Sequence, residues 1–183
     1  SVMLTLQHGS DVTCDIPLGA FNYVCPPSND NCGTPTVLTV NPDYSCAVVS
    51  PGTVIGATDS GLTNSTCFGT EDDDVWYSFV ATSTTHRISL VNAAGSNTDM
   101  YHVIYDGTGG CTALGAALLC SDADVSNPTG LVIGNTYYVQ VYTYTSTPNQ
   151  TTTFNVCVGT PPTCYVPTAL SASTTSRYWN QAG

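Results

Sequence analysis

The sequence predicts an all-β fold, a jelly-roll-like antiparallel β-sandwich held together by disulfides. Helical periodicity is almost absent, and alternating β-branched and aromatic runs recur between clusters of Gly, Pro, Asn and Asp. About ten short strands separated by such turn signals indicate a sandwich or jelly roll. Nine cysteines are spread along the chain and largely lack the C-x-x-C spacing of zinc or thioredoxin-like motifs, so disulfides are expected.

The expected strands follow one another at short intervals. They are 36–40, 44–49, 52–58, 74–82, 86–92, 100–105, 114–120, 129–133, 136–145 and 152–158. In the segment 136–145 the side chains alternate with a period of two. The segment 74–82 carries aromatic residues on both of its faces, which predicts either a strand covered on both sides or one exposed aromatic ring.

Proline-rich stretches divide the chain. "VCPPSNDNC" and "GTPPTCYVPTALSAS" have the restricted flexibility of Pro-rich linkers. We therefore expect a preceding element and linker over 1–25, the sandwich over 26–162, and a linker with the start of a following domain over 163–183. No segment has the pattern of a signal peptide or a membrane-spanning helix, which predicts a removed signal or a piece of a longer secreted chain.

The charge balance narrows the class of partner. Two basic residues face thirteen acids, for a formal net charge of -11. Phosphate binding depends on Lys and Arg, so nucleic acid is excluded, and anionic membrane surfaces are disfavoured. A strongly negative chain attracts cations, and Ca²⁺ is the cation best suited to carboxylate and carbonyl oxygens.

The segment "EDDDVWYSF" places four acids directly before an aromatic strand. A solvated turn, a metal site and a catalytic carboxylate cluster are the alternatives. Mutual repulsion without a nearby lysine favours a cation over a bare turn, and alternation lets at most two of the acids share one ion.

A second group of acids comprises Asp99, Asp106, Asp122 and Asp124. Aspartates that form turns are the preferred interpretation of this group.

No catalytic motif is present. His8, His86 and His102 are scattered, without H-x-H or H-E-x-x-H spacing, and no G-x-S-x-G occurs. Paired carboxylates of a glycosidase would need a fixed separation and one raised pKa, which a sequence cannot demonstrate. We therefore expect no enzyme and no catalytic residue.

The cysteines and the aromatic residues supply further candidates. Short loops favour the pairs Cys111–Cys120, Cys46–Cys67 and Cys14–Cys25, with Cys32–Cys157 across the sandwich ends and Cys164 left over.

Aromatic side chains that could stack on sugar rings are the ligand-binding candidates, against the alternative that they are ordinary strand residues. These candidates are Trp76, Tyr101, Tyr138, Tyr142 and Tyr144.

The order of several motifs resembles a known family. These motifs are "PPSNDNCGTPTVLTV", "GATDSG", "EDDDVWYSFVAT", "DMYHVIYDG", "LLCSDAD", "LVIGNTYYVQVYTY" and "TFNVCVGTPP". Over about residues 26–162 they resemble a repeat module of large secreted bacterial adhesins and hydrolases, related to the pre-peptidase C-terminal domain and to bacterial collagen-binding domains. The tail "CYVPTALSASTTS" is similar to the start of a fibronectin type III domain.

The resemblance implies a non-catalytic, calcium-binding sandwich whose metal lies between the acidic linker and the D-W-Y-x-F strand. Transferred by motif, the candidate ligands are Asn29, Asp30, Asp72, Asp73 and Asp74, to which Asp99 is added. It also implies an adhesion or spacer module on a bacterial cell surface, with a polysaccharide or protein fibre as partner and self-association into a filament left open. The alternative is a carbohydrate-binding module attached to a secreted hydrolase.

Overall fold

The structure is a computed structural model that describes residues 2–6, 16–21, 24–62 and 67–162. At the N-terminus, β1 (Val2–Leu6) and β2 (Ile16–Phe21) pair antiparallel and only with each other. The expected last strand of a preceding element is thus a two-stranded hairpin. In the described part of the chain, no helix is long and apolar enough to cross a membrane.

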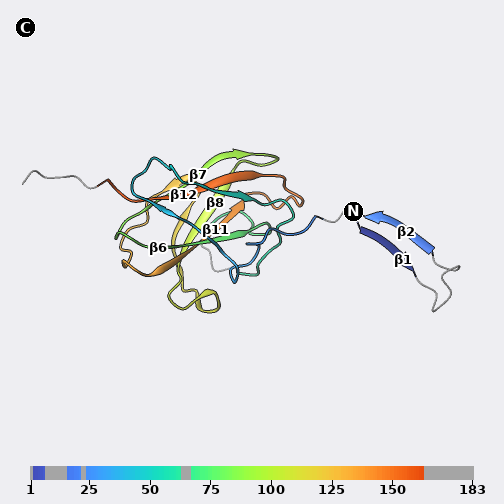
Figure 1. Ribbon diagram of the computed structural model, residues 1–183, viewed down its shortest axis with the longest axis horizontal. Helices are drawn as coiled ribbons and strands as arrows, with labels where there is room; N and C mark the ends of the chain where they lie inside the picture. The colour runs from blue at the N-terminus through green and yellow to red at the C-terminus, as the bar shows by residue number, and fades with distance from the viewer. Residues whose placement is uncertain (1, 7–15, 22–23, 63–66, 163–183) are drawn as a thin grey trace, which may run out of the picture.

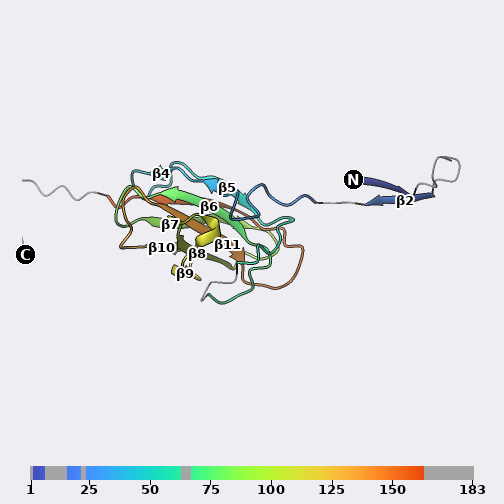
Figure 2. The same cartoon turned by 90° about the horizontal axis from the view of Figure 1, so that it is seen from below.

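The remaining strands form two five-stranded sheets, which confirms the all-β sandwich (Figures 1 and 2). The β11 sheet has the order β3 (Thr36–Val37), β6 (Val75–Val80), β11 (Thr136–Thr143), β8 (Met100–Asp106) and β9 (Ala117–Ser121). The β12 sheet runs from β10 (Val125–Ser126) through β7 (Arg87–Ala94) to β12 (Thr153–Gly159), against which β4 (Val40–Asn41) and β5 (Ser50–Thr53) both pair. The sheets are mixed, because β3–β6 and β4–β12 are parallel.

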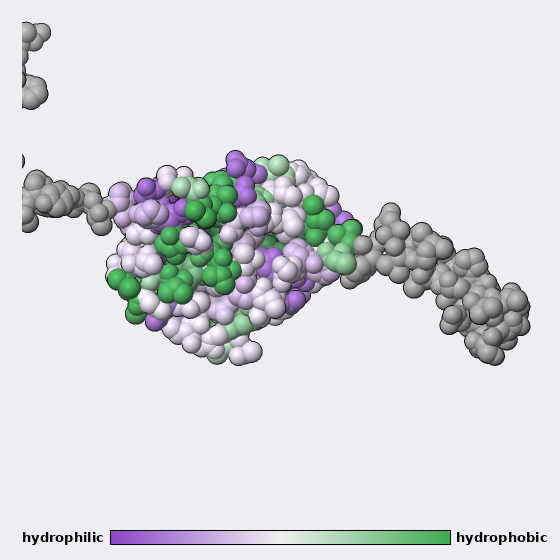
Figure 3. All heavy atoms as spheres, viewed as in Figure 1, coloured by the Kyte–Doolittle hydropathy of each residue, from purple (hydrophilic) through white to green (hydrophobic). Residues whose placement is uncertain are grey.

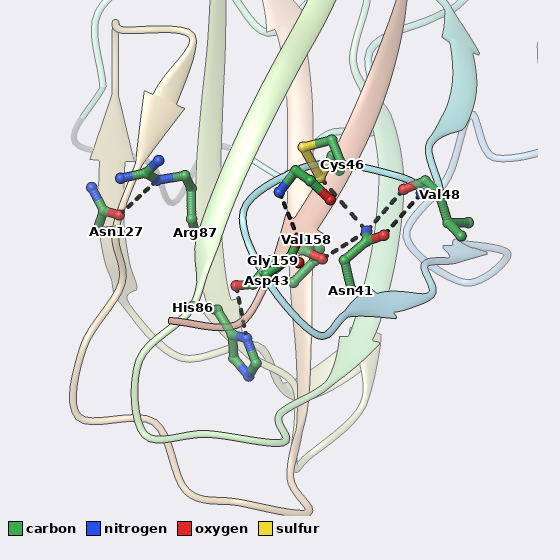
Figure 4. Close-up of a disulfide and its surroundings, with 11 residues drawn as sticks. Asn41, Asp43, Cys46, Val48, His86, Arg87, Asn127, Val158 and Gly159 are labelled. Atoms are coloured by element: carbon green, nitrogen blue, oxygen red, sulfur yellow. Dashed lines mark hydrogen bonds between the residues drawn. A yellow bond between two sulfur atoms is a disulfide. The ribbon is translucent and has the colours of Figure 1, made fainter. Parts of the chain in front are cut away.

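Two predicted strands, 44–49 and 129–133, do not form, and the predicted strand 36–40 is divided between β3 and β4 in different sheets. The segment 44–49 forms turns and bends instead of a strand, because Asp43 caps the Ser45 amide and Asn41 bonds to both backbone groups of Val48. The Asn41 amide also donates to the Val158 carbonyl, which fixes this loop beside the end of β12 (Figure 4). The segment 129–133 contributes only an isolated bridge between Thr129 and Thr85, and β10 forms just before it.

The main core lies between the two sheets. Alternate residues of each central strand point into it, as a period of two requires. Its buried members include Val75, Tyr77 and Phe79 of β6, Val139 and Val141 of β11, Ile88 and Leu90 of β7, and Val156 and Val158 of β12. These side chains come from strands far apart in the sequence, so the core fixes the order of both sheets.

A second apolar layer covers the outer face of the β11 sheet. Trp76, Tyr105 and Tyr142 are almost completely buried there, and Leu62 and Leu114 of the covering loops pack against them. The aromatic residues on both faces of the 74–82 segment are therefore explained by a strand that is covered on both sides. Two disulfides, Cys32–Cys111 and Cys67–Cys120, hold the covering segments in place.

The predicted pairs Cys111–Cys120, Cys46–Cys67 and Cys32–Cys157 are wrong. The described bridges are Cys32–Cys111, Cys46–Cys157 and Cys67–Cys120, and Cys25 is exposed and free. Cys14, the predicted partner of Cys25, and Cys164 lie outside the described residues. The bridges join positions 79, 111 and 53 residues apart: one links two covering segments, one links a loop to β12, and one links a loop to the edge strand β9. Three disulfides indicate an oxidising compartment outside the cytosol.

The described chain enters and leaves the sandwich at opposite ends (Figure 1). On the incoming side, Asn29 exchanges hydrogen bonds with Trp76 at the start of β6: the Trp76 amide donates to the Asn29 carbonyl and the Asn29 side chain donates back. On the outgoing side, the Thr160 hydroxyl lies within 3.4 Å of the Thr82 hydroxyl, just beyond the end of β6. The length of β6 therefore separates the two linkers.

The surface is weakly polar, as the low content of charged residues predicts. In Figure 3, hydrophobic residues gather in patches over one face among pale, weakly polar ones. Exposed apolar side chains include Val37, Val80, Ile133 and Phe68. Exposed charged side chains on this surface are mainly carboxylates, among them Asp59, Asp99, Asp122 and Asp124.

Candidate functional site

Asp74 is the innermost of the clustered acids, and its side chain is completely buried. Its carboxylate accepts hydrogen bonds from the Ser60 amide and hydroxyl, the Trp76 indole and the Gln140 amide. Burial raises the pKa of Asp74, and these hydrogen bonds oppose that shift. Three of these donors bond to Oδ2 and the Ser60 amide bonds to Oδ1. Asp74 therefore joins the loop at Ser60 to the β11 sheet through a fully buried carboxylate.

Asp73 points to a different partner. Its two oxygens accept from the Thr143 amide at 2.9 Å and the Thr143 hydroxyl at 2.6 Å, at the end of β11. Burial raises the pKa of Asp73 to about 6; the bonds to Thr143 oppose this shift, and the charges of Asp72 and Asp74 add to it. A cation beside Asp73 would favour its charged form and so oppose the effect of burial.

Asp72 is the acid whose charge the protein leaves uncompensated. Its Oδ1 atom is buried and has no hydrogen-bond partner among the described residues. A buried carboxylate oxygen without a partner loses its hydration without compensation, which is costly. A bound cation or a water molecule would restore that interaction.

Asp72 and Asp73 line a cavity of about 410 Å³ that the incoming linker helps to close. Val24 and Pro26 of the linker form part of its wall. The other lining residues are Val54, Gly56, Ala57, Thr58, Thr147, Pro148, Asn149 and Gln150. No basic side chain is among these lining residues, so the two carboxylates dominate the local field.

The linker is fastened beside this cavity by Asp30. Both oxygens of Asp30 accept hydrogen bonds from Thr58, one from its amide and one from its hydroxyl, each at 2.7 Å. Thr58 itself lines the cavity. The pattern repeats that of Asp73 with Thr143 and Asp74 with Ser60: a buried carboxylate holds both the backbone and the hydroxyl of one Ser or Thr.

The six predicted metal ligands are not assembled in one place. Asp72 and Asp73 share the cavity, whereas Asn29, Asp30 and Asp74 do not line it. The Asn29 side chain donates to the Trp76 carbonyl, and Asp30 and Asp74 accept from Thr58 and Ser60. Asp99 is exposed at the start of β8, outside the cavity. Among the described residues, no three His, Cys, Asp or Glu side chains form a group that could hold a metal ion. The hydroxyl partners Thr58, Ser60 and Thr143 were not identified from the sequence, which gave no sign of their pairing with the acids.

The predicted ligand-binding aromatics are mostly buried. Trp76 and Tyr142 are fully buried under the covering loops, and Tyr101 is 5% exposed. Tyr138 is half-buried, and Tyr144 is 49% exposed. The described surface therefore offers no row of exposed rings from these five candidates, because the second apolar layer covers most of that face.

Tyr101 lies at the edge of this layer, between rings and acids. It stacks with Tyr142 and with Tyr144, each at a centroid distance of 5.8 Å. Burial, a hydrogen bond with Asp122 and the charges of Asp122 and Asp99 together raise the pKa of Tyr101. The ring of Phe68 is 77% exposed, and the Phe68 carbonyl accepts from the Tyr142 hydroxyl.

Two histidines are buried and have structural roles. His86 Nε2 accepts from the amides of Thr82 and Ser83, and Nδ1 lies 3.2 Å from the Gly159 carbonyl. His102 Nε2 is 2.7 Å from the Ser126 hydroxyl, while its Nδ1 has no partner among the described residues. Burial lowers the pKa of both imidazoles, that of His102 to about 4. His8 lies outside the described residues.

Comparisons with known proteins do not assign a family. No family model matches the chain, and no curated protein matches it. Among solved structures, the chain is similar to a periplasmic inhibitor of g-type lysozyme from Aeromonas hydrophila, with 13% identity and a TM-score of 0.35, over 67% of this chain and 97% of the other. At that score the likeness carries no functional argument, so function is argued from the site.

Proposed function

We propose that this chain is a non-catalytic extracellular module for adhesion or spacing, in which a calcium ion fixes the linker to the sandwich. The observation that carries the proposal is the buried, unpartnered Oδ1 of Asp72, in a cavity shared with Asp73 and with Val24 and Pro26 of the linker. A cation there would contact the acids that directly precede β6 and the wall that the linker forms.

Calcium fits the chemistry of this cavity better than other common metals. The available donors are carboxylate and carbonyl oxygens, which hard cations prefer, and neither His nor Cys lines the cavity. Ca²⁺ takes roughly six to eight oxygens, so two carboxylates need backbone carbonyls or water to complete the shell. Asp73 accepts only one hydrogen bond on each oxygen and retains lone pairs for an ion.

The path of the chain supports the spacer role. The linkers lie at opposite ends of the sandwich, so a series of such modules would extend along one direction (Figure 1). Asp30 and Asn29 already bind the incoming linker to Thr58 and Trp76. A metal ion would add a further contact at the same junction and would stiffen it. We place the module, by the order of its motifs, with the pre-peptidase C-terminal and collagen-binding repeats of bacterial surface proteins.

Calcium titration by calorimetry, with thermal unfolding in calcium and in chelator, tests the proposal. Calcium at about one hundred times its dissociation constant stabilises the folded state by about 2.7 kcal/mol. Asp72→Asn should remove this gain without weakening the protein in chelator, because Asp72 Oδ1 holds no protein donor.

Asp99→Asn is the matched control, since Asp99 is exposed and outside the cavity. It should keep the full calcium response. An unchanged melting temperature on adding calcium to the unsubstituted protein would refute the calcium site. Equal losses in both variants would show a diffuse attraction to a negative chain.

The alternative function, a carbohydrate-binding module of a secreted hydrolase, has less support. Burial of Trp76 and Tyr142 removes two of the five aromatic candidates from any contact with a sugar. Only Tyr144 and the neighbouring Phe68 offer widely exposed rings at that edge. An array of glycans probed with the whole chain would test this alternative directly.

A further inference from the structure

Two exposed rings and two exposed carboxylates meet at one edge of the β11 sheet. We define the aromatic–acidic patch as Phe68, Asp99, Tyr101, Asp122 and Tyr144. Phe68 is 77% exposed and Tyr144 is 49% exposed, while Tyr101 forms the buried base between them and the acids. Asp99 and Asp122 are exposed, and both lie close enough to Tyr101 to raise its pKa, after the effect of burial.

The backbone holds the patch in a defined arrangement. β11 and β8 pair Tyr142 with Tyr101, and the Tyr144 amide donates to the Asp99 carbonyl at 2.9 Å, so Asp99 lies opposite Tyr144. The disulfide Cys67–Cys120 ties Phe68 to the end of β9, two residues before Asp122. Phe68 and Asp122, which lie outside the strands, are thus both anchored to the sheet that carries Tyr101 and Tyr144.

We propose that the aromatic–acidic patch docks a Lys or Arg side chain of a basic partner protein. The proposal refines the adhesion function above by naming the class of partner, and it does not require the calcium site. A cation over the face of an aromatic ring gains from the ring's electrostatics, and adjacent carboxylates add direct attraction. Aromatic rings with acids at their rim therefore recognise a guanidinium or ammonium group with an apolar stem.

The protein itself supplies no cation to this patch from its described residues. Its net charge is -11, and Arg87 is the basic residue among the positions that the structure describes. Arg87 is engaged elsewhere: its guanidinium lies 3.9 Å from the centre of the Tyr44 ring, and its Nε donates to Asn127. The charges of Asp99 and Asp122 are therefore available to an external partner.

A basic side chain suits the patch better than a sugar does. Sugar platforms offer a broad open aromatic face. Tyr101 stacks with both Tyr142 and Tyr144 and is 5% exposed, so it presents no such face. The exposed rings here are those of Phe68 and Tyr144, and Asp99 is hydrogen-bonded through its backbone to Tyr144, which suits a single cationic side chain with an apolar stem.

The experiment uses the whole chain labelled at its aromatic carbons and the peptide Ac-Gly-Arg-Gly-Arg-Gly-NH2, with a matched peptide carrying citrulline for arginine. The arginine peptide should shift the ring resonances of Tyr144 and Phe68 in a saturable way, and the citrulline peptide should not. Replacing both acids, Asp99→Asn with Asp122→Asn, should weaken binding about twofold to tenfold, as expected for two exposed ion pairs. Tyr144→Ala should weaken it by a comparable factor.

Asp43→Asn is the matched control, because Asp43 is exposed beside the Arg87–Tyr44 pair and an Asn there still caps its turn. It should leave peptide binding unchanged. Equal shifts with the citrulline peptide, or unchanged binding in the double variant, would overturn the proposal. Shifts produced by chito-oligosaccharides and not by the arginine peptide would overturn it in favour of a sugar. Recording each titration in calcium and in chelator separates a failure of the patch from a failure of the calcium site.

Discussion

Asp73 holds Thr143 through two bonds at once, one from the backbone amide and one from the hydroxyl. The same arrangement joins Asp74 to Ser60 and Asp30 to Thr58. The crowding of acids before β6 is therefore structural in large part, because Asp73 and Asp74 each bind the backbone amide and the hydroxyl of another segment. Among these three aspartates, Asp72 is the one whose buried oxygen has no hydrogen-bond partner in the described part of the chain.

Replacing Asp74 by Ala should destabilise the sandwich strongly. The change leaves the Trp76 indole, the Gln140 amide and the Ser60 amide without their acceptor in a buried site. Unsatisfied buried donors cost about 1–3 kcal/mol each, so we expect a loss of at least about 3 kcal/mol in urea unfolding. Asp106→Ala, at an exposed turn, is the control and should cost less than about 1 kcal/mol. Similar losses in the two variants would contradict the role assigned to Asp74.

Removing the Cys46–Cys157 bridge should lower stability more than removing the Cys67–Cys120 bridge. The two bridges span 111 and 53 residues, and a longer closed loop restricts the unfolded chain more. The chain-entropy relation gives about 4.8 and about 4.2 kcal/mol, so the loss should be large in both double Cys→Ala variants. Cys25→Ser should leave the melting temperature unchanged, since Cys25 is exposed and free. A reversed order of the two losses would show that native packing outweighs loop length.

The sequence was a good guide to the fold where its signals are local. Alternation identified β6 and β11, and the aromatic residues on both faces of β6 left open a strand covered on two sides, which the layer around Trp76 confirms. The disulfide pairs could not be obtained in this way, because each bridge depends on contacts between distant strands. For the same reason the sequence grouped Asp72, Asp73 and Asp74 as candidate ligands, although Asp72 and Asp73 line one cavity and Asp74 is bonded to Ser60 away from it.

The buried His102 should make the protein less stable as the pH falls. Its pKa in the folded state is about 4, below the ordinary value of 6.5, so below about pH 6.5 the unfolded chain binds the extra proton more strongly. The stability that depends on a neutral His102 is fully present above pH 6.5. It is lost progressively toward pH 4, by about 3 kcal/mol in total. The free energy of unfolding, measured from pH 7.5 to pH 4, should therefore fall more steeply than in His102→Gln.

Subtracting the pH profile of His102→Gln from that of the unsubstituted protein isolates the effect of His102 from that of the acids. The raised pKa of Asp73 acts in the opposite direction, because the folded state binds its proton more readily and gains stability as the pH falls through about 6. That contribution is present in both proteins and cancels. Parallel pH profiles would show that the pKa of His102 is the same in the folded and unfolded states, and would contradict the effect of burial.

A methyl group at Gly52 should collide with Tyr77. A Cβ atom added at Gly52 would approach the Tyr77 hydroxyl and the ring of Phe154 far more closely than van der Waals contact allows. Overpacking of this kind costs about 1–3 kcal/mol, so Gly52→Ala should lower the midpoint of urea unfolding. Gly33→Ala is the matched control, because no atom lies within 4 Å of the added carbon.

The double variant Gly52→Ala with Tyr77→Phe tests the cause of that loss. The Tyr77 hydroxyl is buried without a hydrogen-bond partner among the described residues, so removing it should cost little by itself. It should also relieve the closest contact of the alanine, which makes the double variant more stable than the sum of the single changes predicts. Additive losses would mean that Phe154, rather than the hydroxyl, limits the space at Gly52.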